Sequence, residues 1–319
     1  MDLHLQNYTP EDAGRVLALQ ERNAARHRGA QVTPPEVYGQ PAFAGGRHIP
    51  LALDGAGDLL GYGAICPPPP GEGGALRVFW AAAVVDPGLP NAQPVREALL
   101  SRLLALAEEH LRSGSGDGGD TPRAEIRLDP AISEGEAIAY ALAHGFERLH
   151  GVYRMVRDLS EPLPDPPAPE GVVCRPWKMA GDEEMGRYLA ARNAAFPERA
   201  WSLEFLRYFS GSPQWAEGTT FSAFAPDGDL VGSVMAYWDP APSGAAPEIG
   251  YTEEVFCRPG WQRQGIATYL LAQALGLLSA NAVRHATLQV SAVSEGVLGL
   301  YTRLGYRVVS ENVILSRPL

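Results

Sequence analysis

The sequence predicts an α/β fold that occurs twice in tandem, and three observations support this expectation. The stretch from Glu253 to Leu271 reads as a strand, a turn and a helix. Patterns of the same kind recur in the first half of the chain at a nearly constant offset. A Pro-rich stretch, residues 158–171, lies between the two halves. The length of 319 residues suits two domains of ~150 residues each.

The strand–turn–helix pattern has clear local causes. Residues 255–257 are strand formers, and Pro259 with Gly260 ends the strand and turns the chain. Apolar residues then recur at helical spacing. These are Ile266, Leu270, Leu271, Ala274, Leu275 and Leu278. The sequence therefore predicts a helix that begins near Ile266 and buries one apolar face.

The segment between the turn and this helix is suited to an anion. Gly265 has no side chain, so a ligand can approach the backbone closely. The first amides of a helix have no partners within the helix, and the helix dipole adds positive potential there. A pyrophosphate group would fit such a place. An ordinary strand–turn–helix with a small residue at the helix start is the alternative interpretation.

Two motifs resemble those of the GNAT superfamily of N-acetyltransferases. The segment Gln262–Ala267 is similar to the family's Q/R-x-x-G-x-G/A segment. Residues 285–306 are similar to a second family pattern, L-x-V-x-x-x-N-x-x-A-x-x-x-Y-x-x-x-G-F/Y. The matching residues there are Leu288, Val290, Tyr301, Gly305 and Tyr306. Ser294 and Val297 depart from it, since the family usually has Asn and Ala at these places.

The resemblance implies a fold, a cofactor and a reaction. Each copy would be a mixed, mostly antiparallel twisted sheet flanked by helices. Acetyl-CoA would be the co-substrate, and the second copy would transfer its acetyl group to a primary amine of a small molecule by direct attack. The expected cofactor-binding residues are Val255, Phe256, Cys257, Gln262, Arg263, Gln264, Gly265, Ile266, Ala267, Thr268, Ser294 and Tyr301.

Proton transfer would need an acidic residue and a tyrosine. An attacking amine must be neutral, and a carboxylate near the end of the central strand could take its proton. Glu248, Glu253 and Glu254 are candidates; the resemblance favours Glu253, four residues before the last strand residue, with Glu254 close behind. Simple alternation places Glu253 on the face of Val255, and Glu254 on the opposite face. By the resemblance, Tyr301 would protonate the leaving thiolate.

The first half of the chain repeats this organisation in a degraded form. Residues 57–61 match residues 228–232, an offset of 171 (228 − 57), and Tyr140 corresponds to Tyr301. Pro90 and Pro94 stand where the phosphate segment would be, and proline has no amide hydrogen to offer an anion. We expect a degenerate domain at 1–157, a linker at 158–171 and a catalytic domain at 172–319.

Composition narrows the function classes. The net charge is −11 and no basic stripe is visible, so we expect no nucleic-acid partner. No apolar run has the ~18 residues of a membrane span, and we expect a cytoplasmic monomer or homodimer. The cysteines Cys66, Cys174 and Cys257 lack metal-ligand spacing, so we expect no metal. A noncatalytic tandem protein that binds an acyl-CoA as a sensor or scaffold is the alternative function.

Overall fold

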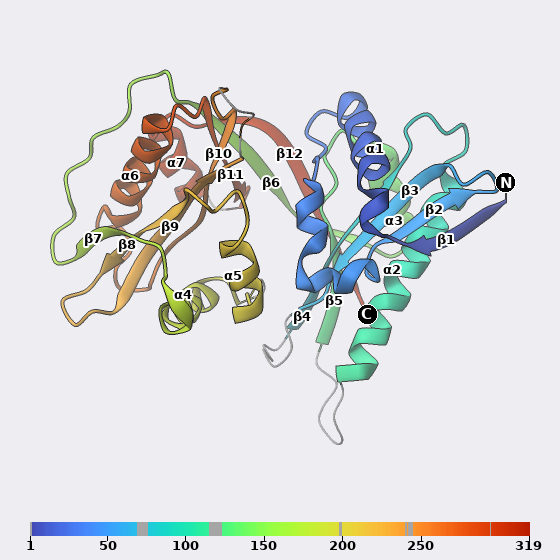
Figure 1. The fold of residues 1–319 in the computed structure, drawn as a ribbon, viewed down its shortest axis with the longest axis horizontal. Helices are drawn as coiled ribbons and strands as arrows, with labels where there is room; N and C mark the ends of the chain where they lie inside the picture. Colours follow the sequence, from blue (N-terminus) through green and yellow to red (C-terminus); the bar gives the residue numbers. More distant parts are fainter. Residues whose placement is uncertain are drawn as a thin grey trace. The chain divides into compact units, whose positions relative to one another are not determined.

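The two halves of the chain fold into the same succession of strands and helices (Figure 1). The computed structural model describes residues 2–68, 76–114, 123–197, 200–239, 241, 245–293 and 295–319. The chain forms two compact units. Unit 1 comprises Met1–Val152 with Ser310–Leu319, and unit 2 comprises Tyr153–Val309.

Unit 1 is built around a sheet whose strands are joined by a long helix and two shorter ones. In chain order its elements are β1 (Leu3–Asn7), α1 (Ala13–Arg26), β2 (Pro50–Asp54), β3 (Leu59–Cys66), β4 (Leu76–Val85), α2 (Gln93–Gly114), β5 (Arg123–Leu128), α3 (Gly135–Ala143) and β6 (Glu147–Asp158). Short 3-10 helices at Pro10–Asp12, Pro35–Gly39 and Pro41–Gly46 lie within its first part.

Unit 2 repeats the order with one additional helix. Its elements are β7 (Val173–Trp177), α4 (Gly181–Ala195), α5 (Leu203–Ser210), β8 (Thr219–Phe224), β9 (Leu230–Trp238), β10 (Ile249–Cys257), α6 (Ile266–Ala280), β11 (His285–Ser291), α7 (Glu295–Arg303) and β12 (Arg307–Pro318). The expected tandem repetition is thus visible element by element.

Strand pairing confirms the mixed, mostly antiparallel sheet that the sequence predicted. In unit 1, β1, β2, β3 and β4 pair antiparallel in turn, and β4 pairs parallel with β5. In unit 2, β7, β8, β9 and β10 pair antiparallel in turn, and β10 pairs parallel with β11. Parallel neighbours need a crossover connection, and helices α2 and α6 supply it.

The last strand of each copy crosses the boundary between the units. The end of β12 pairs antiparallel with β5, through Leu315 opposite Leu128, so the last ten residues belong to unit 1. Strand β6 neighbours β11, and its residues from Tyr153 onward belong to unit 2. The boundary that we expected at residue 157 therefore falls inside β6, and residues 310–319, expected with the second domain, lie in unit 1.

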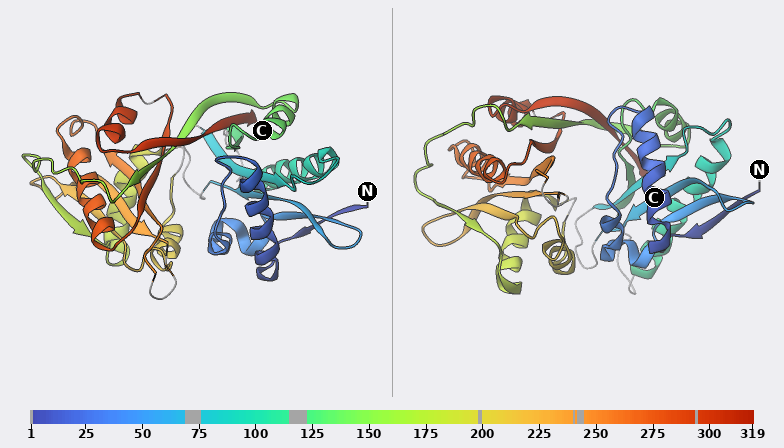
Figure 2. Two further views of the ribbon diagram at one scale, coloured as in Figure 1. Left: turned by 90° about the horizontal axis from the view of Figure 1, so that it is seen from above. Right: turned by 45° about the horizontal axis from the view of Figure 1, so that its top comes forward.

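Helices cover both faces of the unit 2 sheet (Figures 1 and 2), and a hydrophobic cluster lies between the helices and the sheet on each face. Helices α6 and α7 pack on one face through Leu270, Leu271 and Leu304, all less than 3% exposed. Helices α4 and α5 pack on the other face, where Tyr188 and Leu206 are fully buried. Alternate residues of β9 supply both clusters, as a strand buried on two sides requires.

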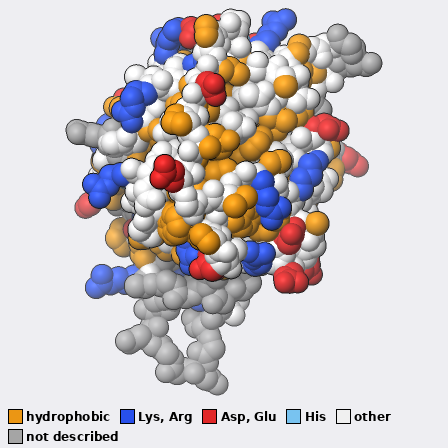
Figure 3. All heavy atoms as spheres, turned by 90° about the vertical axis from the view of Figure 1, so that its left-hand side faces the viewer, with side chains coloured by type: hydrophobic (Ala, Val, Ile, Leu, Met, Phe, Trp, Pro, Cys, Tyr) orange, Lys and Arg blue, Asp and Glu red, His pale blue; other side chains and the backbone are white. Residues whose placement is uncertain are grey.

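The face of the protein drawn in Figure 3 is not dominated by charge of either sign. In Figure 3, basic and acidic side chains are interspersed around an area where hydrophobic side chains gather. Over the described ranges, no helix is both long enough and apolar enough to cross a membrane. The same ranges contain no cluster of three or more His, Cys, Asp or Glu side chains suited to a metal ion.

A buried arginine fixes the end of helix α7. Arg157 of β6 is 3% exposed, and its guanidinium donates to the Leu304 carbonyl and to the Pro162 carbonyl, both at 2.6 Å. Gly305 follows at φ +88°, and a Cβ there would overlap the Arg157 guanidinium. A glycine is therefore required at position 305 by both backbone conformation and space.

We predict that Gly305→Ala lowers the free energy of unfolding by roughly 3 kcal/mol, because it adds overpacking to the cost of a positive φ. Gly228→Ala is the matched control, since Gly228 has the same φ of +88° but open space around a Cβ. It should cost about 1 kcal/mol. Urea denaturation of both variants tests this, and equal losses would show that Arg157 yields to the new methyl group.

Candidate active site

The strands β10 and β11 separate partway along their length. Their paired residues run from Ile249 opposite His285 to Tyr251 opposite Thr287. Beyond this point β10 continues to Cys257 and β11 continues to Ser291 with no further pair between their described residues. The edge of β10 that faces β11 therefore carries backbone donors and acceptors without a ladder partner, which an extended ligand can use.

A β-bulge lies in β10 at the same level. On the side of β9, Glu253 pairs with Met235 and Phe256 pairs with Ser233, so two residues of β10 oppose the single residue Val234. Glu254, within the bulge, has φ +50°, which is uncommon for a residue with a side chain. A bulge of this kind bends its strand and re-aims the side chains that follow.

The bulge makes the side-chain alternation that we expected along β10 wrong. Glu253 does not share a face with Val255 and Cys257. Val255 and Cys257 pack toward the α6 cluster, whereas Phe256 packs toward α4. The Glu253 carboxylate accepts a hydrogen bond from Tyr237, a member of the α4 cluster. The extra residue shifts the two-residue period by one, so Glu253 and Phe256 come to lie on the same side.

The loop between β10 and α6 turns the chain through residues in the left-handed backbone conformation. Gly260, Arg263 and Gly265 all have positive φ, and Gly265 is the N-cap residue of α6 at φ +81°. Gly265 has no side chain that could cap the helix, and a Cβ on Gly265 would meet no atom within 4 Å. The start of α6 is thus open, with its dipole and its first amides directed at the same place.

Side chains of the loop brace its own backbone. Gln262 donates to the Cys257 carbonyl at 3.2 Å, and Gln264 donates to the Gly260 carbonyl at 2.8 Å. The Ala267 amide donates to the Cys257 thiol, and burial raises the pKa of that thiol to about 11, so it stays neutral. Ile266 is 1% exposed and serves the core. The side chain of Arg263 is exposed.

The three candidate carboxylates have different environments. Glu253 Oε2 accepts from the Tyr237 hydroxyl at 2.6 Å. Burial, and next the Glu253 charge, raise the pKa of Tyr237 well above its usual value, so its hydroxyl keeps the proton that it donates. Glu254 accepts from Arg192 Nε at 2.8 Å in a nearly buried ion pair. Glu248 is 59% exposed and contacts Arg284 and His285 at the surface.

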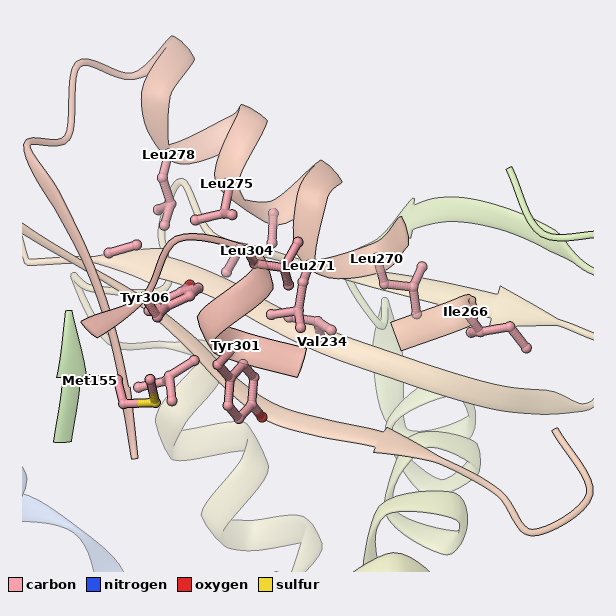
Figure 4. Packing of buried hydrophobic residues seen from close by; sticks show 14 of the residues in the cluster. Met155, Val234, Ile266, Leu270, Leu271, Leu275, Leu278, Tyr301, Leu304 and Tyr306 are labelled. Carbon is pink, nitrogen blue, oxygen red and sulfur yellow. The ribbon is translucent and has the colours of Figure 1, made fainter. Parts of the chain in front are cut away.

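Tyr301 lies on α7 among the residues of the α6 cluster (Figure 4). Its ring is 5% exposed, and in Figure 4 its hydroxyl points away from the leucines of α6. Burial raises the pKa of Tyr301. The neighbouring Tyr306, with ring centroids 5.9 Å apart, bonds Thr252 of β10 at 2.5 Å. The pair therefore ties α7 to the strand that carries the bulge.

Two expected cofactor-binding residues remain to be placed, and sequence reasoning missed two residues that bond the candidate carboxylates. Ser294 lies outside the described residues. Thr268 stands half-buried in the first turn of α6. Sequence reasoning missed Tyr237 and Arg192, the partners of Glu253 and Glu254. The sequence signal for Arg192 is its helical spacing from Tyr188, which puts it on the buried face of α4.

The corresponding region of unit 1 differs in its helix start. Helix α2 begins at Gln93, whose amide is already bonded to the Asn91 side chain at 3.3 Å. Pro94 follows with no amide hydrogen. Beside this helix start lies a cavity of about 420 Å³, lined in part by Val84 and by Tyr140, the counterpart of Tyr301. The hydroxyl of Tyr140 is buried there without a hydrogen-bond partner among the described residues.

Comparison with known sequences places these features in a family. The model of the acetyltransferase (GNAT) family matches residues 187–306. The chain is 30% identical over 315 residues to a mycothiol acetyltransferase of Thermomonospora curvata, covering 97% of this chain and 95% of the relative. It is 32% identical over 309 residues to a mycothiol acetyltransferase of Geodermatophilus obscurus, covering 93% and 91%.

Solved structures share the fold over the whole length. A GCN5-related N-acetyltransferase from Sphaerobacter thermophilus has a TM-score of 0.72 at 19% identity, covering 99% of this chain and 95% of that one. A tandem GNAT protein from the clavulanic acid biosynthesis pathway has a TM-score of 0.69 at 16% identity, covering 99% and 98%. Together, the repeated fold, the two motifs and the full-length relatives show that the chain belongs to the GNAT family of acetyltransferases, as a tandem member.

Proposed function

We propose that the second copy transfers an acetyl group from acetyl-CoA to a primary amine of a small molecule, by direct attack. The observation that carries this proposal is the separation of β10 from β11 beside the start of α6, with Glu253 on β10 and Tyr301 on α7. The family model supports the same copy, because residues 187–306 lie within unit 2.

The residues present fit acetyl-CoA in both of its polar parts. The open N-terminus of α6, with Gly265 and the amides of Ile266 and Thr268, suits a pyrophosphate. The unpaired edge of β10 beyond Tyr251, including the backbone of residues 255–257, suits an extended amide-bearing arm. When bound there, acetyl-CoA supplies an activated acetyl group as a thioester.

Two side chains of unit 2 would move the protons. Glu253 takes the proton of the incoming ammonium, directly or through one water, and Tyr237 holds its carboxylate in a fixed orientation. Tyr301 gives its proton to the leaving sulfur, and its raised pKa keeps the hydroxyl in the protonated form at neutral pH. Backbone amides near Phe256 and Cys257 polarise the carbonyl that is attacked.

The relatives suggest where to look for the acceptor. Proteins named mycothiol acetyltransferase align over more than nine-tenths of their length, so an amine related to mycothiol is the first acceptor to test. The alternative of a noncatalytic sensor or scaffold is not favoured by these relatives. We further propose a cytoplasmic monomer or homodimer, since the described cysteines are free thiols.

Unit 1 is proposed to lack the catalytic function. Its helix start offers fewer amides to an anion, because Asn91 occupies that of Gln93 and Pro94 has none. The cavity beside Tyr140 nevertheless has room for a ligand, so the number of cofactor sites per chain is the decisive quantity. We assign to this unit a structural or substrate-shaping role.

We predict that calorimetric titration finds one acetyl-CoA site per chain and that Gly265→Glu weakens it at least roughly 100-fold, since a carboxylate would meet the phosphates. Gly228→Glu is the control, because Gly228 has a similar φ and equally open space but lies in the β8–β9 turn. Two sites in the wild type would contradict our interpretation of Asn91 and Pro94.

We predict that Glu253→Gln lowers kcat/KM by about 100- to 10,000-fold and removes the acidic limb of its pH profile, since the amide cannot accept the proton. Glu248→Gln, at the exposed surface carboxylate, should leave both rate and profile unchanged. Initial rates with the accepted amine between pH 5 and 10 supply the test. An acidic limb that persists in Glu253→Gln would assign the base elsewhere.

We predict that Tyr301→Phe lowers kcat by about 100-fold with little change in KM, because the ring still packs while the proton donor is lost. Tyr140→Phe makes the same change in unit 1 and should leave kcat as in the wild type. Measurement of steady-state kcat and KM for the two variants tests this prediction. An equal effect of both, or of neither, would remove Tyr301 from the proposed mechanism.

A further inference from the structure

The bulge in β10 is a strained feature that needs an anchor. Glu254 has φ +50°, a conformation that residues with a Cβ rarely adopt outside sites where the surrounding structure enforces it. Ladder pairing with β9 is interrupted between Glu253 and Phe256, so the neighbouring strand does not hold the bulged residues in the usual way. Another part of the protein must therefore hold Glu254 in place.

Arg192 of α4 is that anchor. Its side chain is fully buried, and Nε donates to Glu254 Oε2 at 2.8 Å. The guanidinium lies 4.3 Å from the ring centroid of Trp201 and 5.2 Å from that of Phe196. Arg192 Nη1 also donates to Asn193 Oδ1 at 3.1 Å. A guanidinium stacked on aromatic faces and bonded in a fixed plane has little freedom to move.

A second set of bonds fixes the aromatic wall beside this arginine. The Asn193 side chain donates to the Trp201 carbonyl and accepts from the Trp201 amide, both at 2.9 Å. Trp201 in turn packs 5.9 Å from the Phe209 ring of α5, at the edge of the α4 cluster. The position of Glu254 is thus set by α4 and the segment that follows it, and not by the sheet alone.

We propose that Arg192 is a positioning residue for acetyl transfer: by holding Glu254 in the bulge, it sets the place of the adjacent Glu253 carboxylate and of the unpaired β10 backbone after Tyr251. Glu254 is committed to this ion pair and does not act as the base. The inference rests on the proposed function of unit 2 for its catalytic consequence. The claim that Arg192 holds Glu254 in the bulge applies to the ligand-free protein as well.

A purely stabilising role is the competing explanation. Buried ion pairs often add little to stability, and apolar pairs of similar size can replace them. A double variant separates the two roles, because it removes both charges and leaves no unpaired one behind. If the ion pair serves stability only, Arg192→Met/Glu254→Gln should recover wild-type behaviour. If the ion pair positions Glu254, the double variant should recover wild-type stability but not the wild-type geometry of the site.

The experiment compares Arg192→Met, Arg192→Lys, Glu254→Gln and the double variant with Arg187→Met, an exposed arginine on the same helix. Amide hydrogen exchange at residues 254–258 and calorimetric binding of acetyl-CoA are the readouts. We expect about tenfold faster exchange and about tenfold weaker binding in Arg192→Met and in the double variant. Partial rescue is expected in Arg192→Lys, and no change in Arg187→Met.

Kinetics then separates position from base catalysis. Glu254→Gln should keep the acidic limb of the kcat/KM profile, because the base is a different residue. Loss of that limb, or wild-type exchange and binding in the double variant, would overturn the proposal. If the wild type binds no acetyl-CoA, the proposed function fails, and exchange at residues 254–258 still decides the positioning. If Arg192→Met does not fold, the double variant carries the test.

Discussion

The loss of pairing between β10 and β11 after Tyr251 and Thr287 is the constraint on which the site depends. Two parallel strands normally satisfy each other's backbone groups, so an edge left open inside a domain must be balanced by other contacts. Three buried polar contacts surround this edge. Arg192 holds Glu254, Thr252 bonds Tyr306, and Arg157 bonds the end of α7. Each joins two segments of unit 2 through a side chain.

Local chemistry explains which parts of this arrangement the sequence could predict. The turn at Pro259–Gly260 and the helix from Ile266 follow from residues adjacent in the chain. The repetition was readable because the same turn glycines recur in both halves. Fold class and reaction class were therefore within reach before any coordinates, and the motif around Gly265 located the helix start to the residue.

Longer-range features were beyond sequence reasoning. The faces of Glu253 and Val255 were assigned wrongly, since a bulge depends on pairing with β9 and on a bond from α4. Arg192 and Glu254 are 62 residues apart in the chain, and neither residue type signals its partner. The division of β6 and β12 between the two units was equally hidden, because it depends on pairing between residues far apart in the chain, such as Leu315 with Leu128.

Comparison of the two copies indicates which features belong to the fold and which belong to the chemistry. Both copies have a parallel pair of strands followed by a helix that carries a tyrosine, Tyr140 or Tyr301. Unit 2 differs in the start of its crossover helix, in the carboxylates of the strand before that helix and in the additional helix α5. Where unit 2 has an uncapped Gly265, unit 1 has an amide bonded by Asn91 and then Pro94.

The strand that precedes the crossover helix also differs between the two units. Where β10 carries Glu253 and Glu254 close to its end, β4 ends in a run of Ala and Val. A run of small and β-branched residues has no carboxylate that could accept a proton or be held by an arginine. Strand β4 itself thus contributes no carboxylate to the cavity of unit 1, whose acidic lining residues, Asp86, Glu134 and Glu136 among them, come from other segments. Both copies have kept the scaffold and the tyrosine, and the pair of strand carboxylates is present in unit 2.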